Sequence, residues 1–220
     1  MTLSPGVEEA VHLPAGEVVL EGQLQIPPAA RGLVLVALGA GATRCARRVQ
    51  EISRTLRDSG FGTLVMDLLT PEEERQYGRR FDIPCLADRM LQLSFDLRPS
   101  LETAKLRLGI LSSATSGAAA LWAAACPEME VSAIVSNEGR LDLVEDLLAD
   151  VHVPTLLVAG SRGGEVTRMN AQLYSRIAAP KDMIVVPGAT DVFEESFARG
   201  ELARWASQWF GCFLAATATN

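Results

Sequence analysis

Residues 106–126 have the sequence LRLGILSSATSGAAALWAAAC, in which a short apolar run, a small polar turn and a run of small apolar residues follow one another. The first part, Leu106–Leu111, is rich in leucine and isoleucine, as is typical of a strand covered by helices on both faces. The last part, Thr115–Cys126, is followed at once by Pro127, which indicates the end of a helix. The segment therefore predicts a buried strand, a tight turn and a helix.

Strand-like and helix-like segments alternate over the rest of the chain. Further apolar runs predict strands at Leu33–Leu38, Thr63–Asp67, Ser132–Ser136, Thr155–Ala159 and Met183–Val186. Helical patterns lie at Arg44–Ser59, Cys85–Leu97, Leu141–Asp150, Val166–Ala178 and Glu194–Leu214. Ahead of them, Val7–Leu13 and Glu17–Ile26 predict a hairpin, and Thr70–Pro84 is a polar excursion. We expect one α/β domain over residues 1–220, with a mixed, mostly parallel sheet of about eight strands and helices on both faces.

Composition excludes several classes of protein. The chain has 220 residues, of which 48% are hydrophobic and 21% charged, and its formal net charge is −7. The apolar content excludes intrinsic disorder, and the acidic balance argues against nucleic-acid binding. No apolar run approaches the roughly 18 residues of a membrane-spanning helix, and the first residues do not resemble a signal peptide. We therefore expect a soluble, cytoplasmic protein that binds neither nucleic acid nor a membrane.

Cysteine and histidine limit the available chemistry. The four cysteines are far apart, with no CxxC pair, which predicts neither a disulfide framework nor a zinc site. The histidines are His12, in the predicted hairpin, and His152, just ahead of a strand. We expect no metal, no cofactor and no catalytic role for either histidine.

Several uncommon segments resemble the small α/β-hydrolases of the dienelactone hydrolase type. They are LEGQLQIP (20–27), RGLVLVALGAG (31–41), MDLLTPEEE (66–74), RRFDIPCLADR (79–89), TSGAAALWAAA (115–125), PTLLVAG (154–160) and VPGATDVFEE (186–195). The likeness extends from about Leu20 to Phe213 and implies an α/β-hydrolase fold without a cap domain. It also implies a catalytic triad, with a serine or cysteine nucleophile exposed on a tight strand-to-helix turn, a histidine base and an acid.

Each position to which the resemblance assigns chemistry is substituted. Aligning Gly117 with the last glycine of the turn motif places Thr115 at the nucleophile and Ser116 beside it. The base falls on Asp191, and the acid falls at or beside Gly163, in the loop that ends at Glu165. The oxyanion-loop motif His-Gly is replaced by Leu38-Gly39. Leu38, Gly39, Ser116, Gly163 and Glu165 are thus the candidate binding residues around a degenerate pair of catalytic positions, Thr115 and Asp191.

The same loops allow other interpretations. Gly39-Ala40-Gly41 after a strand is a weak dinucleotide-type motif that lacks its third glycine. Arg44, Arg47 and Arg48 begin a predicted helix and could attract an anion, to which Arg162 could add.

The residues favour a hydrolase-fold protein that has lost its triad, because a threonine hydroxyl without an adjacent base is a poor nucleophile and aspartate is a weak base toward an alcohol. We predict a non-hydrolytic binding or partner protein, with a small-molecule ligand in the vestigial pocket, a second copy of the chain or an active paralogue as partner. The alternative is an enzyme of another class (an isomerase, lyase or cyclase) or a weak hydrolase that uses Thr115 and Asp191.

Overall fold

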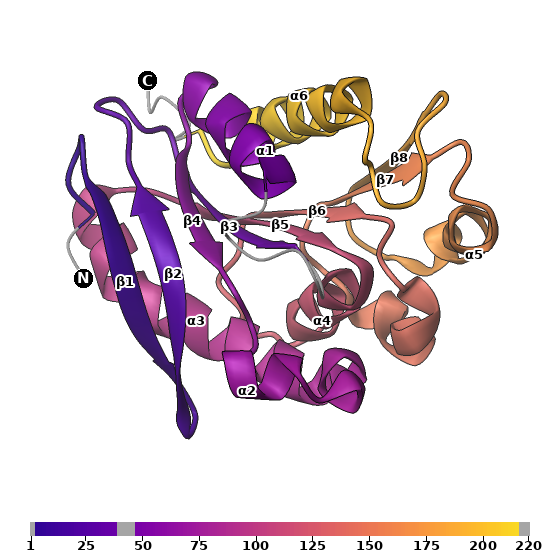
Figure 1. The fold of residues 1–220 in the computed structure, drawn as a ribbon, viewed down its shortest axis with the longest axis horizontal. Helices are drawn as coiled ribbons and strands as arrows, with labels where there is room; N and C mark the ends of the chain where they lie inside the picture. The colour runs from indigo at the N-terminus through magenta and orange to yellow at the C-terminus, as the bar shows by residue number, and fades with distance from the viewer. Residues whose placement is uncertain (1–2, 39–46, 216–220) are drawn as a thin grey trace.

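The computed structural model describes residues 3–38 and 47–215, and within them eight strands form one sheet in the order β1-β2-β4-β3-β5-β6-β7-β8 (Figure 1). The hairpin of β1 (Glu8–Ala15) and β2 (Val18–Gln25) is antiparallel, and β2 pairs in the same sense with β4 (Gly62–Met66). The remaining pairs are parallel and add β3 (Leu33–Leu38), β5 (Leu108–Ser113), β6 (Ala133–Asn137), β7 (Thr155–Gly160) and β8 (Lys181–Val186). The predicted mixed, mostly parallel sheet is confirmed.

Helices cover both faces of the sheet (Figure 1). One face packs against α1 (Arg47–Asp58) and α6 (Ser196–Phe213). The other face packs against α3 (Ile83–Ala104), α4 (Ala114–Ala124) and the 3₁₀ helix η2 (Leu141–Asp150). The shorter helices are α2 (Pro71–Glu74), η1 (Tyr77–Phe81), α5 (Glu165–Leu173) and η3 (Tyr174–Arg176). Among the described residues no separate cap domain is formed.

The central strand β3 shows why the strand sequences lack polar alternation. Leu33 and Leu35 lie in the core beneath α3 and α4, whereas Val34 and Val36 lie in the core beneath α1 and α6. Successive side chains of a strand point to opposite faces, so a sheet with two covered faces needs apolar residues at every position. The four side chains are fully buried, as this arrangement requires.

Helix α3 is longer than the sequence pattern predicts. It was expected to end at Leu97, before Pro99, but it continues through the proline to Ala104. A proline inside a helix removes one backbone hydrogen bond and costs about 3 kcal/mol. Leu97 and Leu101 are buried in the same core on either side of the proline, and their burial offsets that cost. The helix ends instead at Lys105, whose φ of 54° is left-handed.

The segment Leu141–Asp150 was expected to be a regular helix. It forms 3₁₀ turns that are interrupted at Val144, where φ is −138°. Leu141, Val144 and Leu148 all remain buried in the core, so the apolar pattern places the right side chains inward although the backbone is not α-helical.

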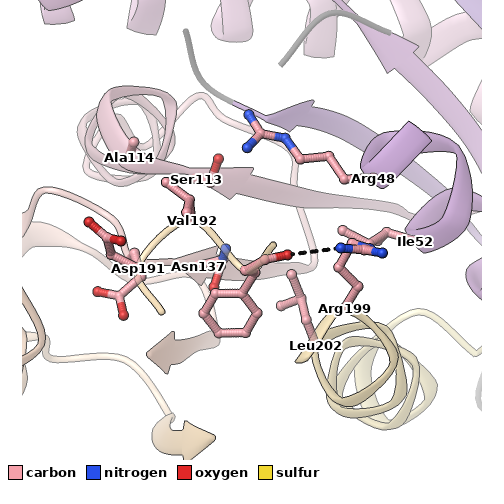
Figure 2. Close-up of a pocket in the computed structure, with 11 residues that line it drawn as sticks. Arg48, Ile52, Ser113, Ala114, Asn137, Asp191, Val192, Arg199 and Leu202 are labelled. Carbon is pink, nitrogen blue, oxygen red and sulfur yellow. Dashed lines mark hydrogen bonds between the residues drawn. The ribbon is translucent and has the colours of Figure 1, made fainter. Parts of the chain in front are cut away.

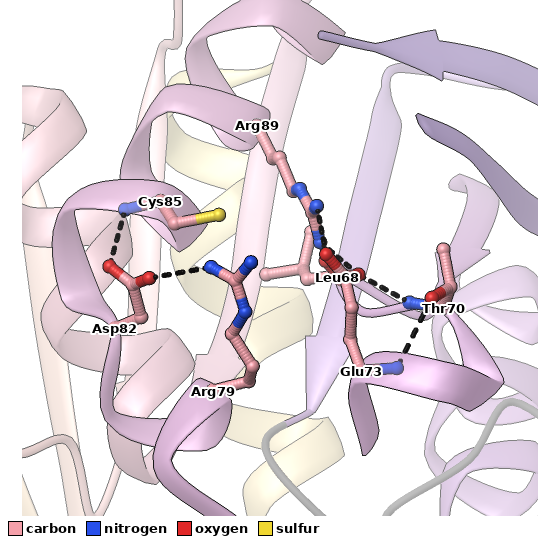
Figure 3. Close-up of polar contacts among 7 residues, drawn as sticks. All are labelled: Leu68, Thr70, Glu73, Arg79, Asp82, Cys85 and Arg89. Carbon is pink, nitrogen blue, oxygen red and sulfur yellow. Dashed lines mark hydrogen bonds and ion pairs between the residues drawn. The ribbon is translucent and has the colours of Figure 1, made fainter. Parts of the chain in front are cut away.

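A buried ion pair fixes the excursion over the sheet. The Arg89 guanidinium of α3 donates two hydrogen bonds to the Glu73 carboxylate of α2, at 2.7 and 2.8 Å, and a third to the Leu68 carbonyl (Figure 3). The side chains of Arg89 and Glu73 are only 9% and 12% exposed. Glu73 also closes a capping box with Thr70 at the start of α2. These hydrogen bonds, above all that from Arg89, lower the pKa of Glu73 to about 2.

We expect Glu73→Gln to lower the free energy of unfolding at neutral pH by about 3 kcal/mol, because it leaves the buried Arg89 without a charged partner. Since the pKa of Glu73 is lower in the folded protein, the contribution of the pair is complete above about pH 4.5 and is lost as the pH falls toward about 2. Urea unfolding across this range measures both effects.

The matched control is Glu72→Gln, which removes the neighbouring carboxylate from a largely exposed pair with Arg75. This change should alter stability by less than about 0.5 kcal/mol. Equal effects of the two substitutions would contradict a special role for the buried pair.

Candidate functional site

The turn between β5 and α4 projects one residue above the end of the sheet. Ala114 follows Ser113, the last residue of β5, and has a left-handed φ of 50°. A residue other than glycine pays roughly 1–2 kcal/mol for this conformation. The Ala114 carbonyl accepts a hydrogen bond from the Arg140 amide at 3.1 Å, and the Ala114 side chain is exposed. The turn has the backbone geometry of a nucleophile elbow, with a methyl group at its apex.

A cavity of about 110 Å³ lies beside this turn (Figure 2). Its wall includes Ala114 and, as polar residues, Arg48, Ser113, Asn137, Glu138, Asp191 and Arg199. These residues come from α1, from the ends of β5 and β6, from the loop after β8 and from α6. Because β5, β6 and β8 run in the same direction through the sheet, their carboxyl ends meet at one edge, where ligands bind in folds of this kind.

Glu138 is the buried carboxyl group of the cavity. It directly follows β6, has a left-handed φ of 47° and is 5% exposed. The Gly160 amide donates a hydrogen bond to its Oε1 at 2.6 Å, and the Thr167 hydroxyl donates to the same oxygen at 3.2 Å. Burial raises the pKa of Glu138, the two hydrogen bonds oppose that shift, and the nearby Asp191 adds to it.

Thr115 and Ser116 do not have the position expected from the sequence. Both are buried in the first turn of α4, and neither is among the residues of the described cavity wall. Ala114 occupies the apex of the turn, one residue earlier than the predicted nucleophile position. The prediction took Gly117 as the last glycine of the turn motif, but this glycine has a packing role. A Cβ at residue 117 would lie 2.8 Å from the Gly139 Cα, so the absence of a side chain allows α4 to approach the loop after β6.

The other predicted site residues do not all lie at the cavity. Asp191 lines the cavity, as the sequence suggested. Gly163 packs against Glu138 and does not supply an acid. Glu165 is 77% exposed at the start of α5, where it lies 3.9 Å from Arg168, and is not in the cavity wall. Leu38 ends β3, but its side chain lies outside the described residues.

Gly39 also lies outside the described residues, together with Ala40, Gly41 and Arg44, so the dinucleotide-type motif and part of the basic cluster stay predictions.

The histidines are far from the site in the fold. His12 is exposed on β1, at the far edge of the sheet, and His152 is exposed just ahead of β7, at the opposite end of that strand from the cavity. Within residues 3–38 and 47–215, no group of three or more histidine, cysteine or acidic side chains is arranged to hold a metal ion. In the same residues no helix has both the length and the hydrophobicity to cross a membrane.

Sequence reasoning missed Asn137 and Glu138. Both residues lie in the polar run Ser136-Asn137-Glu138-Gly139, at the end of the predicted strand Ser132–Ser136. A polar run at the carboxyl end of a parallel strand is the signal that could have found them.

Solved structures provide the decisive comparison. A dienelactone hydrolase from Anabaena variabilis is 39% identical to this chain and superimposes on it with a TM-score of 0.88. The match covers 94% of this chain and 98% of that one. The chain belongs to the dienelactone hydrolase family. The resemblance noted in the sequence is thereby confirmed, and the α/β-hydrolase fold with it.

More distant structures share the fold. A dienelactone hydrolase-like promiscuous phosphotriesterase, P91, from metagenomic libraries is 16% identical over 95% of this chain, with a TM-score of 0.76. Est1E from Butyrivibrio proteoclasticus is 13% identical over 92% of the chain, with a TM-score of 0.73. No protein-family model matches the chain.

Curated relatives from two strains of Mycobacterium tuberculosis are each 40% identical over 203 residues, which is 92% of this chain. Each is named "Putative phosphoribosyl transferase". The chain spans about half the length of these relatives, 46% in each case.

We expect Gly117→Ala to lower the free energy of unfolding by about 1–3 kcal/mol, because the added methyl group meets the Gly139 backbone. Gly211→Ala is the matched control, since a Cβ on this glycine of α6 meets nothing within 4 Å. It should raise stability by roughly 0.5 kcal/mol through helix propensity. Thermal unfolding compares the two, and a stable Gly117→Ala variant would contradict the close approach beneath the turn.

Proposed function

We propose that this dienelactone hydrolase-family protein does not hydrolyse esters or lactones and acts as a binding or partner protein that keeps the family's cavity. Ala114 is the observation that supports the proposal. In this fold the tight turn after β5 exposes the nucleophile above the sheet, and a methyl group cannot form an acyl-enzyme.

The neighbouring groups do not replace the lost chemistry. Asp191 stands at the position where the family has its histidine, and a carboxylate is a weak base toward an alcohol. The hydroxyl groups of Thr115 and Ser116 are buried within α4. Ser113 lines the cavity but precedes the turn, at the last position of β5.

A partner role is supported by the curated relatives. In those Mycobacterium tuberculosis proteins the matching region is less than half of the polypeptide, so a unit of this kind occurs joined to a further stretch of protein. Within the proposal, the partner of this chain is a small-molecule ligand, a second copy or an active paralogue. We assign no phosphoribosyl transfer to the chain, because that name describes proteins of twice its length.

A second candidate is an enzyme of another class, such as an isomerase, lyase or cyclase. The raised pKa of Glu138 favours it, since a buried carboxyl group of raised pKa is suited to donating a proton. In this reading Glu138 and Asp191 are the proton-transfer groups, in place of Thr115 and Asp191. Any turnover that is found should then be lost in Glu138→Gln and kept in Thr115→Ala.

We expect the purified protein to hydrolyse p-nitrophenyl acetate and simple lactones no faster than Thr115→Ala, Ser113→Ala and Asp191→Ala variants of it. The reason is that the turn carries no nucleophile. Initial rates measured against a buffer blank test this expectation. Turnover above the blank that disappears in any one of these variants would overturn the proposal.

Restoring the missing groups should restore chemistry. We expect Ala114→Ser combined with Asp191→His to raise the rate of p-nitrophenyl acetate hydrolysis by roughly tenfold or more, since a hydroxyl at the turn then faces an imidazole base.

The matched control for this restoration is Thr115→Ser combined with Asp191→His, which should produce no gain because residue 115 is buried in the first turn of α4 and does not line the cavity. A gain in the control alone would show that Thr115, and not Ala114, stands at the nucleophile position.

A further inference from the structure

We propose that Glu138 has taken the place of the triad acid and that Glu138, Asp191 and Asn137 together form a binding site for the ammonium group of a small organic cation. The inference deepens the proposed function and rests on it, since it names the class of ligand for the same cavity. It is argued from four features of the described residues.

The first feature is the location of the Glu138 carboxyl group. A Cβ on Gly163, where the sequence alignment places the family's acid, would lie 2.3 Å from Glu138 Oε1 and 2.4 Å from Thr167 Oγ1. The space beside residue 163 is therefore filled by a carboxyl group that arrives from β6. The Gly160 amide, at the end of β7, holds this carboxyl group with a 2.6 Å hydrogen bond. In this proposal the acid follows β6 instead of β7, but its carboxyl group occupies the same location.

The second feature is the group opposite. In an active relative the acid would face a histidine, which gains a positive charge during catalysis. Here Asp191 takes that position, and its charge acts on Glu138 across the cavity. Two carboxylates that share a partly buried site repel each other unless a proton or a cation lies between them. The side of the cavity that Glu138 and Asp191 form therefore attracts positive charge.

The third feature is an unsatisfied acceptor. Asn137 lines the same cavity, its side chain is 6% exposed, and its Oδ1 has no hydrogen-bond partner among the described residues. Buried polar atoms are rarely left unpaired, because each lost hydrogen bond costs about 1–3 kcal/mol. An ammonium group has three N–H donors, which equals the number of side chains that offer acceptors: Glu138, Asp191 and Asn137.

The fourth feature is the rest of the wall. Ile52, Val192, Phe193 and Leu202 supply an apolar surface, and the volume of about 110 Å³ suits a group of a few heavy atoms. Figure 2 shows the two arginines on the side away from Asp191. Arg199 pairs there with Glu51, at 2.6 Å, and Glu51 also pairs with Arg47, at 2.7 Å. The positive charge of the wall, from Arg48 and Arg199, is therefore separated from the acidic side formed by Glu138 and Asp191. A short alkylammonium ion fits this cavity, with its ammonium group at the acidic side and its alkyl chain against the apolar surface.

The test uses n-propylammonium chloride as the probe and measures binding to the purified protein by NMR chemical-shift titration at neutral pH and fixed ionic strength. Propan-1-ol and sodium propionate, which have the same chain length, serve as the neutral and anionic comparisons. We expect saturable binding of propylammonium alone, with a Kd on the order of millimolar, as is usual for so small a ligand.

Two variants locate the site. Asp191→Asn and Glu138→Gln should each weaken propylammonium binding by about fivefold or more, since each replaces a carboxyl group of the site with an amide of similar volume, which cannot carry a negative charge. Asp191 is exposed, so its variant tests the proposal even where Glu138→Gln alters folding. Glu145→Gln is the matched control: this carboxylate pairs with Arg176 on the surface, and its loss should leave binding unchanged.

Absence of saturable binding, equal binding of propan-1-ol or propionate, or full binding in Asp191→Asn would overturn the inference. These outcomes are separate from failure of the proposed function. Ester hydrolysis by the native protein would end the proposed function, whether or not propylammonium binds. Loss of propylammonium binding without any hydrolysis would end only the present inference.

Discussion

The left-handed turn at Ala114 is the constraint around which the site is arranged. It ends β5 and starts α4 within one residue, and α4 approaches the loop after β6 very closely. Gly117 and Gly139 permit that approach, since a Cβ on either one would collide with Ser136 or with the other glycine. The same close packing brings Asn137 and Glu138 to the side of the turn. The cavity is thus a consequence of backbone geometry that does not depend on a nucleophile.

The left-handed turn at Ala114 has a packing role that is independent of the side chain at its apex. A strained turn is normally retained because function needs it, yet here the residue in it is an alanine. The left-handed conformation at Ala114 is explained by packing, because the turn also fixes the position of α4 relative to β6. The Glu138 carboxyl group, which follows β6, fills the space beside Gly163, which follows β7.

Two separate cores support this edge of the sheet. The core beneath α1 and α6 and the core beneath α3 and α4 meet only at the strands, whose side chains alternate between them. The excursion that contains α2 is attached to α3 by the pair of Glu73 and Arg89. A rigid sheet with two covered faces leaves the loops at its carboxyl edge free to vary in chemistry.

The sequence by itself predicted the fold class, because runs of valine, isoleucine and leucine without polar alternation are typical of strands covered on both faces. The resemblance of several segments to dienelactone hydrolases indicated the family. It also placed Asp191 at the site. It could not determine which residue stands at the turn, since Ala114 and Thr115 differ by one position and only the backbone conformation separates them. Nor could it reveal that the Glu138 carboxyl group lies beside Gly163. These residues follow different strands, and local sequence patterns contain no information on which side chain from one loop fills the space beside another. Only tertiary packing decides it.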